Sequence, residues 1–167
     1  MKKVILLEDN LKVAEEFIDQ LIEWKEKEKR DIKIDKMLFY EDTLNAEEVK
    51  ELEGVRSICN KGIDVEWVNV ISFDYVMDNL YSDPDNLFIF DTYLLSDESF
   101  VFKYRVNVGY ALQKINDKRI WFYTNAGADI KDSIDRIFGD MVIETELEEG
   151  RHMLRFMDNK EFVQKVG

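Results

Sequence analysis

The chain is poor in several residue types that particular protein classes need. It has one cysteine, Cys59, which cannot form an internal disulfide, and one histidine, His152, which has no partner motif and no expected ligand or catalytic role. No apolar run approaches the roughly 20 residues needed to cross a bilayer. Basic residues are also few: 23 Lys and Arg stand against 36 Asp and Glu, giving a formal charge of −13. These shortages argue against a disulfide-rich secreted protein, a membrane protein, and direct binding to nucleic acid or anionic membranes.

The start of the chain carries no recognisable targeting signal. The apolar run Val4–Leu7 leads directly into Glu8 and Asp9, without the longer apolar core of a signal peptide. Together with the lone cysteine, this predicts the reducing cytoplasm. With 167 residues, 46% of them apolar, the chain is long enough for one domain with a substantial core. We therefore expect a single domain over residues 1–167.

Apolar runs typical of strands alternate with segments of helical periodicity. The predicted strands cover residues 3–7, 63–70, 87–90, 119–123 and 141–143, and the predicted helices cover residues 11–29, 73–81, 97–116 and 129–138. This alternation predicts an α/β fold with parallel strands and right-handed crossovers. Residues 31–62 interrupt the first crossover with a strand-like and a helix-like stretch, in which Asn45 and Glu48 indicate a capping box.

The tail, about residues 146–167, fits the alternation less well. Glu148-Glu149-Gly150 can be the turn of a hairpin that pairs Ile143–Leu147 with His152–Phe156, before a short last helix from Asn159. About two dozen residues follow the fifth predicted strand, too few for a helix-turn-helix output domain beside that helix.

Three predicted strands end on polar residues that can form one acidic pocket. Glu8 and Asp9 follow the first strand, Asp91 ends a middle strand and Thr124 ends a later one. The carboxyl ends of parallel strands meet at one edge of a sheet, where ligands bind. Oxygen-only ligation suits Mg²⁺, and a Mg²⁺ beside Asp91 would let this carboxylate attack phosphorus. Asp9, or Asn10 after it, can also cap the first helix, with or without a metal.

These features resemble the receiver domain of two-component response regulators. The resemblance is carried by Val4–Asn10, Asp64–Asp91 and Ile120–Ala126, and with the order of elements it covers most of the chain. It implies a flavodoxin-like, five-stranded parallel sheet with helices on both faces. Residues 31–62 would then be an insertion between the first helix and the second strand.

The same resemblance implies roles for individual residues. Asp91 would accept a phosphoryl group from a histidine kinase or phosphotransfer protein, and Thr124 would bind the phosphoryl group as the switch residue. The Mg²⁺ ligands would be the side chains of Glu8, Asp9 and Asp91 and the backbone carbonyl of Tyr93. The protein would be a regulator and not a turnover enzyme, with output through a homodimer or a separate downstream protein effector.

One departure from the family pattern opens an alternative. The family's lysine after the fifth strand falls near Glu144, so an acid takes the place of a phosphoryl-binding cation, and Met141 replaces the aromatic switch residue. A cation would be restored at this site if the register of the fifth strand were shifted, or if Lys131 reached the site. The alternative is a pseudo-receiver, an interaction module that is not phosphorylated.

A further alternative is a small phosphohydrolase that resembles the haloacid dehalogenase group. Thr124-Asn125 and Gly139-Asp140 favour it. Against it, Tyr93 stands where those enzymes carry a general acid two residues after the nucleophile, and Glu8 and Asp9 would have no role.

Overall fold

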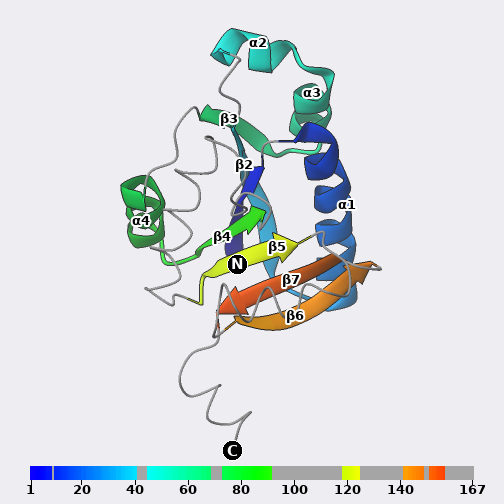
Figure 1. The fold of residues 1–167 in the computed structure, drawn as a ribbon, viewed down its shortest axis with the longest axis vertical. Helices are drawn as coiled ribbons and strands as arrows, with labels where there is room; N and C mark the ends of the chain where they lie inside the picture. Colours follow the sequence, from blue (N-terminus) through cyan, green and yellow to red (C-terminus); the bar gives the residue numbers. More distant parts are fainter. Residues whose placement is uncertain are drawn as a thin grey trace, which may run out of the picture. The chain divides into compact units, whose positions relative to one another are not determined.

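A computed structural model gives the fold of the chain and describes residues 1–8, 10–40, 45–68, 73–91, 118–124, 141–148 and 151–156 (Figure 1). The chain divides into two compact units, Met1–Ile89 and Phe90–Gly167. The boundary falls within strand β4 (Asn86–Asp91). Each unit has strands of its own, and the single domain expected from the chain length stays a prediction.

The first unit contains a parallel sheet with the strand order β3-β2-β1-β4. Besides β4 its strands are β1 (Lys2–Glu8), β2 (Ile32–Tyr40) and β3 (Asp64–Val68). Strand β2 pairs in parallel with both β1 and β3. The interior strand β1 is apolar at consecutive positions, as a strand covered on both faces must be, and these buried residues are Val4, Ile5, Leu6 and Leu7.

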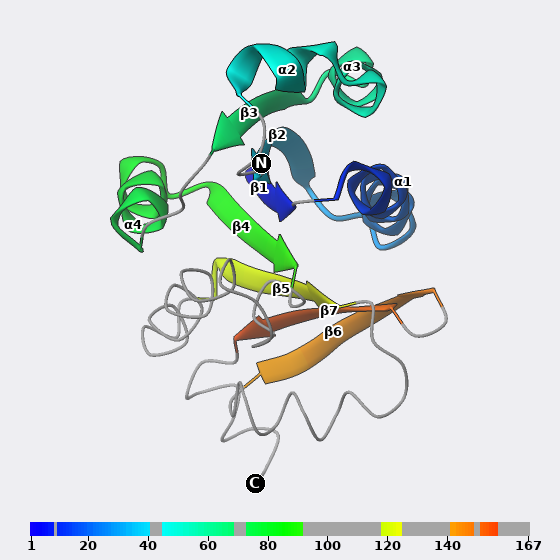
Figure 2. The same cartoon turned by 45° about the horizontal axis from the view of Figure 1, so that its top comes forward.

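Strand β4 lies on the other side of β1 and runs in the same direction, as the two arrows in Figure 2 show. The two strands begin together, because the backbone N–H of Lys3 donates to the carbonyl of Asp85 at 2.8 Å. Phe88 and Ile89 of β4 are fully buried. The parallel direction that the alternation of elements predicted is thus present in these two strands.

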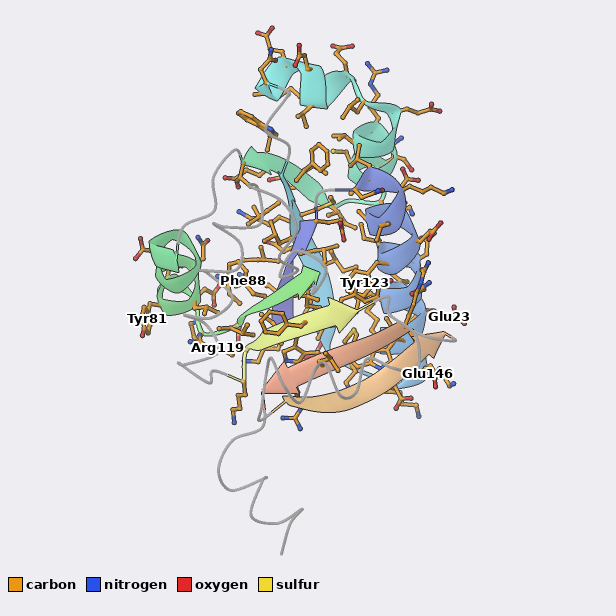
Figure 3. All side chains as sticks on the ribbon, in the orientation of Figure 1. Glu23, Tyr81, Phe88, Arg119, Tyr123 and Glu146 are labelled. Atoms are coloured by element: carbon orange, nitrogen blue, oxygen red, sulfur yellow. The ribbon has the colours of Figure 1, made fainter. Side chains whose placement is uncertain are left out.

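Helices cover both faces of this sheet. Figure 2 shows α1 (Leu11–Lys27) and α4 (Phe73–Ser82) on opposite sides of the strands. The buried residues of α1 recur at helical spacing and form one stripe: Ala14, Phe17, Ile18, Leu21 and Trp24. Tyr81 of α4 points away from the sheet and is 74% exposed (Figure 3). The predicted arrangement of helices on both faces is thus confirmed for the first unit.

Two short helices connect β2 to β3: α2 (Ala46–Glu51) and α3 (Glu53–Asn60). The predicted capping box at the start of α2 is present, since the Asn45 side chain accepts from the N–H of Glu48 at 2.9 Å and the Glu48 carboxylate accepts from the N–H of Asn45 at 2.9 Å. The single helix-like stretch of the sequence is divided at Leu52, whose backbone is extended.

The prediction that residues 31–62 are an insertion is wrong. Their first part is β2, which pairs with the whole of β1 from Lys2 opposite Ile32 to Glu8 opposite Phe39. Strand β3, predicted as the second strand of the sheet, pairs with β2 instead. The order β3-β2-β1-β4 therefore differs from the 2-1-3 order that begins a flavodoxin-like sheet and matches the 3-2-1-4 order that begins dinucleotide-binding sheets.

The second unit contains a hairpin paired with a further strand. Its strands are β5 (Ile120–Thr124), β6 (Met141–Glu148) and β7 (Arg151–Phe156), in the order β5-β7-β6. Strand β7 is antiparallel to both neighbours. The hairpin considered for the tail is thus confirmed, and the prediction of an entirely parallel sheet is wrong. A connection of only two residues between β6 and β7 can join antiparallel strands but cannot join parallel ones. The helices predicted over 97–116 and 129–138, and residues 157–167 of the tail, lie outside the described residues.

The end of α1 holds one residue in the left-handed region. Lys29 has a φ of 53°, directly after the C-cap Glu28. The N–H of Glu28 donates to the carbonyl of Trp24 at 2.9 Å, and the N–H of Arg30 donates to the carbonyl of Lys25 at 2.8 Å. A left-handed conformation costs a residue with a side chain roughly 1–2 kcal/mol, and glycine is the usual choice after a helix end.

We expect Lys29→Gly to raise the free energy of unfolding by about 0.5–1 kcal/mol, because the relief of strain exceeds the entropy that glycine adds to the unfolded chain. Denaturant unfolding followed by circular dichroism measures this difference. The control is Glu28→Gly, at a φ of −88°, which should lower stability by about the same amount. A Lys29→Gly variant that is less stable than the native protein would contradict the assignment of strain.

Ion pairs join the starts of β1 and β4. The Lys3 Nζ donates to Asp83 Oδ2 at 2.9 Å, and Asp83 Oδ1 accepts from the N–H of Asp85 at 2.9 Å. The backbone hydrogen bond from Asp85, and next the hydrogen bond from Lys3, hold the pKa of Asp83 below its usual value. The pKa of Lys3 is correspondingly raised by its hydrogen bond to Asp83.

These shifts predict an acid-sensitive contribution to stability. A carboxylate whose pKa is lowered by folding stabilises the native state above the pKa of the unfolded chain, about 4, and stops doing so as the pH falls through the lowered value. Asp83→Asn should therefore lower the melting temperature at pH 7, and its difference from the native protein should vanish in acid. Asp85→Asn is the control, because its carboxylate lies 3.8 Å from Lys2 Nζ and its effect should be smaller. If the difference in melting temperature between Asp83→Asn and the native protein stayed the same in acid, the charge of Asp83 would be excluded as its cause.

Candidate functional site

Glu8 is the last residue of β1 and is only 1% exposed. It follows the buried run Val4–Leu7, so the strand that forms the interior of the sheet delivers a carboxylate to the sheet's edge. Its Oε1 accepts a hydrogen bond from the backbone N–H of Asn10 at 3.1 Å. An acidic group so deeply buried costs free energy unless hydrogen bonds or a cation compensate for lost hydration. Glu8 is therefore the strongest candidate for a functional residue in the first unit.

The turn after Glu8 is held by the N-cap of α1. The Asn10 side chain accepts from the N–H of Val13 at 3.2 Å, and its backbone carbonyl accepts from the N–H of Ala14 at 2.9 Å. Of the two residues predicted as caps, Asn10 is the one that caps the helix. Asp9, the other residue predicted as a cap and the second predicted metal ligand, lies outside the described residues.

Asp91 is the last residue of β4, the strand beside β1. Its backbone is part of the strand, and its side chain lies outside the described part of the structure, as does the whole of Tyr93. The predicted phospho-acceptor is therefore at a strand end, as expected. Whether its carboxylate meets those of Glu8 and Asp9 stays a prediction.

Thr124 is the last residue of β5, in agreement with the prediction that it ends a strand. Its partner in the register is His152, the second residue of β7. His152 is in turn opposite Glu146 of β6. Directly opposite residues of neighbouring strands occupy the same face, with Cβ atoms about 4.5–5.5 Å apart. Thr124, His152 and Glu146 thus occupy one row of the backbone register across three strands of the second unit, and the side chains of Thr124 and His152 lie outside the described part of the structure.

Glu144, at the predicted position of the family's lysine, does not follow a strand but lies inside one. Strand β6 continues to Glu148, and the register shifts between Ile143, opposite Leu154, and Thr145, opposite Met153. Glu144 is the extra residue at this bulge. Because β7 separates β6 from β5, the strand that accompanies Thr124 is β7.

His152 is the residue that sequence reasoning set aside and that the register brings beside a predicted site residue. The turn at Glu148-Glu149-Gly150 predicted the hairpin, and hence the pairing of β7 with β6. The pairing of β7 with β5 had no local signal, since it depends on which strand occupies the free edge of β5. The row with Thr124 could therefore not be found from the sequence.

The predicted Mg²⁺ site is not tested by the described side chains. Among those side chains, no group of three or more His, Cys, Asp or Glu residues could hold a metal ion. The predicted ligand set includes Asp9 and Asp91, whose side chains fall outside that part. Glu8 contributes oxygen atoms, the donor type that Mg²⁺ prefers.

The order of the strands in the first unit also invites comparison with dinucleotide-binding sheets. In those sheets a glycine-rich turn after the first strand lets the backbone approach a pyrophosphate. Here the residues after β1 are Glu8, Asp9 and Asn10, and no glycine occurs between Glu8 and Lys27. A buried acid at this turn repels a phosphate unless a cation lies between them, so the order of strands alone does not indicate a dinucleotide site.

None of the helices in the described part of the chain has both the length and the apolar character needed to cross a membrane. In comparisons with protein-family models, with curated proteins and with solved structures, no match to this chain was found.

Proposed function

We propose that the chain is a receiver-like signalling domain that accepts a phosphoryl group on Asp91 with the help of Mg²⁺. The observation that carries the proposal is Glu8, an acid buried to 1% exposure at the carboxyl end of an interior parallel strand. Strand β4, which begins beside β1 and runs parallel to it, ends at Asp91. Carboxyl ends of parallel strands are where ligands bind in sheets of this class.

The proposed metal ligands are chemically consistent with one hard cation. Glu8, Asp9 and Asp91 would supply carboxylate oxygens, and Tyr93 a backbone carbonyl, as ligands of a Mg²⁺ ion. A Mg²⁺ ion held by these residues would offset the repulsion between an attacking carboxylate and the oxygens of a phosphoryl group. A buried Glu8 favours such a cation, because the cation compensates the carboxylate for its lost hydration.

The proposed chemistry is a single phosphoryl transfer without turnover. A carboxylate oxygen of Asp91 forms a bond to phosphorus while the P–N bond of a donor phosphohistidine breaks, and the electron pair of that bond leaves with the imidazole nitrogen. Thr124 then donates a hydrogen bond to a phosphoryl oxygen. The donor would be a histidine kinase or phosphotransfer protein, and the signal would pass to a downstream effector or a second copy of the chain.

The alternative is a pseudo-receiver that binds partners without being phosphorylated. It is favoured by Glu144, which stands where the resemblance expects a phosphoryl-binding lysine. The bulge in β6 and the position of β7 beside β5 weaken this argument, because they separate Glu144 from the strand that carries Thr124. The two functions differ in their response to a phosphoryl mimic.

The experiment uses Trp121, three residues before Thr124 in β5, as a fluorescent reporter. Replacing Trp24 and Trp67 by Phe leaves Trp121 as the single tryptophan of the chain. Titration with Mg²⁺, with and without beryllofluoride, should change its fluorescence. The same titration of Asp91→Asn should show an apparent affinity at least about tenfold weaker, as removal of a partner at a metal site typically causes.

A small acyl phosphate gives a second, independent measurement. Intact-protein mass spectrometry should detect one added phosphoryl group in the native chain and none in Asp91→Asn. Asp85→Asn, at the residue directly before the start of β4, is the matched control and should behave like the native chain. No response to Mg²⁺, beryllofluoride or acyl phosphate in the native chain would overturn the proposal in favour of the pseudo-receiver, and repeated turnover of the acyl phosphate would favour a phosphohydrolase.

The cap at Asn10 gives a separate prediction, about the turn that places the proposed ligands Glu8 and Asp9. Asn10→Ala should lower the free energy of unfolding by about 1 kcal/mol, because the N–H of Val13 loses its acceptor, while Asn10→Ser should keep most of the stability. Denaturant unfolding measures both. If Asn10→Ala and Asn10→Ser lowered the free energy of unfolding equally, loss of the helix cap would not be the cause of the lower stability.

A further inference from the structure

We propose that Phe39 is a positioning residue of the Mg²⁺ site, which shields the Glu8 carboxylate from water and thereby strengthens its binding of the cation. The inference rests on the proposed function, in which Glu8 is a metal ligand. It starts from the register of the first unit, where Phe39 of β2 lies directly opposite Glu8 of β1. Both residues are buried: Glu8 is 1% exposed and Phe39 is 3% exposed.

A bulge in β2 decides that Phe39, and not its neighbour, lies opposite Glu8. The register shifts after Val4, where Asp35 is an extra residue in β2. With an unbroken register Glu8 would be opposite Leu38 instead. Bulges are rare between parallel strands and frequent beside functional sites, where they redirect side chains. The bulge therefore indicates that the pairing of Glu8 with Phe39 serves the site.

The rest of this face of the sheet is apolar where the structure describes it. Side chains alternate along a strand, so Glu8 shares its face with Leu6, which is opposite Met37. Leu6 is 1% exposed and Met37 is fully buried. In the next strand Trp67 of β3 is opposite Phe39 and is half-buried. Glu8 therefore lies at the end of an apolar face, with two aromatic residues in its row.

Such surroundings strengthen the attraction between a carboxylate and a cation. The interaction between two charges grows as water is excluded, because the effective dielectric constant falls. A carboxylate that lost its hydration when the protein folded also has less hydration to lose when it binds a cation. Apolar groups around a metal site control solvent access and dielectric in this way. Phe39 would act through Glu8, since a phenyl ring supplies no oxygen ligand.

Calorimetric titration with Mg²⁺ tests the shielding. Phe39→Ala should bind Mg²⁺ about tenfold more weakly than the native chain, and Phe39→Met, which stays apolar and fills most of the space, should remain within about threefold. The matched control is Leu38→Ala. Leu38 is 1% exposed but is opposite Leu7, so it lies on the other face of β2. The Mg²⁺ affinity of this control should equal that of the native chain.

Salt dependence separates shielding from a general loss of structure. Monovalent salt screens exposed charges much more than buried ones. Between about 0.05 and 0.5 M KCl, the Mg²⁺ affinity of Phe39→Ala should fall more steeply than that of the native chain or of Leu38→Ala. Equal slopes for the three proteins would overturn the role of Phe39.

A double-mutant cycle gives a readout without any metal. In the presence of a chelator, Glu8→Gln should change the urea midpoint by different amounts in the native and the Phe39→Ala backgrounds, because water reaches the carboxylate only in the second. In the Leu38→Ala background the change should equal that in the native background. Additive effects of Glu8→Gln and Phe39→Ala would refute the shielding. Phe39→Thr, whose branched side chain suits a strand, replaces Phe39→Ala in all experiments if the alanine variant does not fold.

The outcomes separate this inference from the proposed function. If the native chain binds Mg²⁺ and beryllofluoride but Phe39→Ala binds Mg²⁺ like Leu38→Ala, the role of Phe39 is refuted and the receiver function remains. If the native chain does not bind Mg²⁺, the receiver function fails, and the role of Phe39 at its metal site fails with it.

Discussion

The burial of β1 on both faces is the constraint on which the first unit depends. Four consecutive apolar residues, Val4–Leu7, are shielded from water, so the strand must have a strand on each side and a helix layer above and below. Strands β2 and β4 fill the sides, and the apolar stripe of α1 covers one face. The same burial carries Glu8 to the edge of the sheet as a shielded carboxylate, which is why a structural constraint also defines the candidate site.

The second unit follows a different constraint, the short connection between β6 and β7. Two residues force these strands to be antiparallel, and the hairpin then offers β7 as the neighbour of β5. This arrangement changes the position of two residues from that expected from the sequence. Glu144 becomes a bulge residue in a strand that does not touch β5, and His152 becomes the neighbour of Thr124.

Local patterns predicted most individual elements and failed where pairing had to be known. The stripe on α1 and the capping box of Asn45 and Glu48 are properties of a few neighbouring residues, and both are present as predicted. The stretch Ile32–Tyr40 also has a clear strand pattern. Its assignment to an insertion was wrong because the residues of a strand do not determine which strand it pairs with. The family resemblance implied that β3 pairs with β1, whereas β2 lies between them.

What the sequence determined by itself, within the described part of the chain, is the existence of most strands and helices, the polar residues at the strand ends, and the acidic character of the turn after β1. These follow from hydrophobic period, propensity and composition within short windows. Only the tertiary structure decided the place of β2 beside β1, the antiparallel insertion of β7, the burial of Glu8 and the row formed by Thr124, His152 and Glu146. Those features depend on contacts between residues far apart in the chain, where the free energy of burial outweighs any local preference.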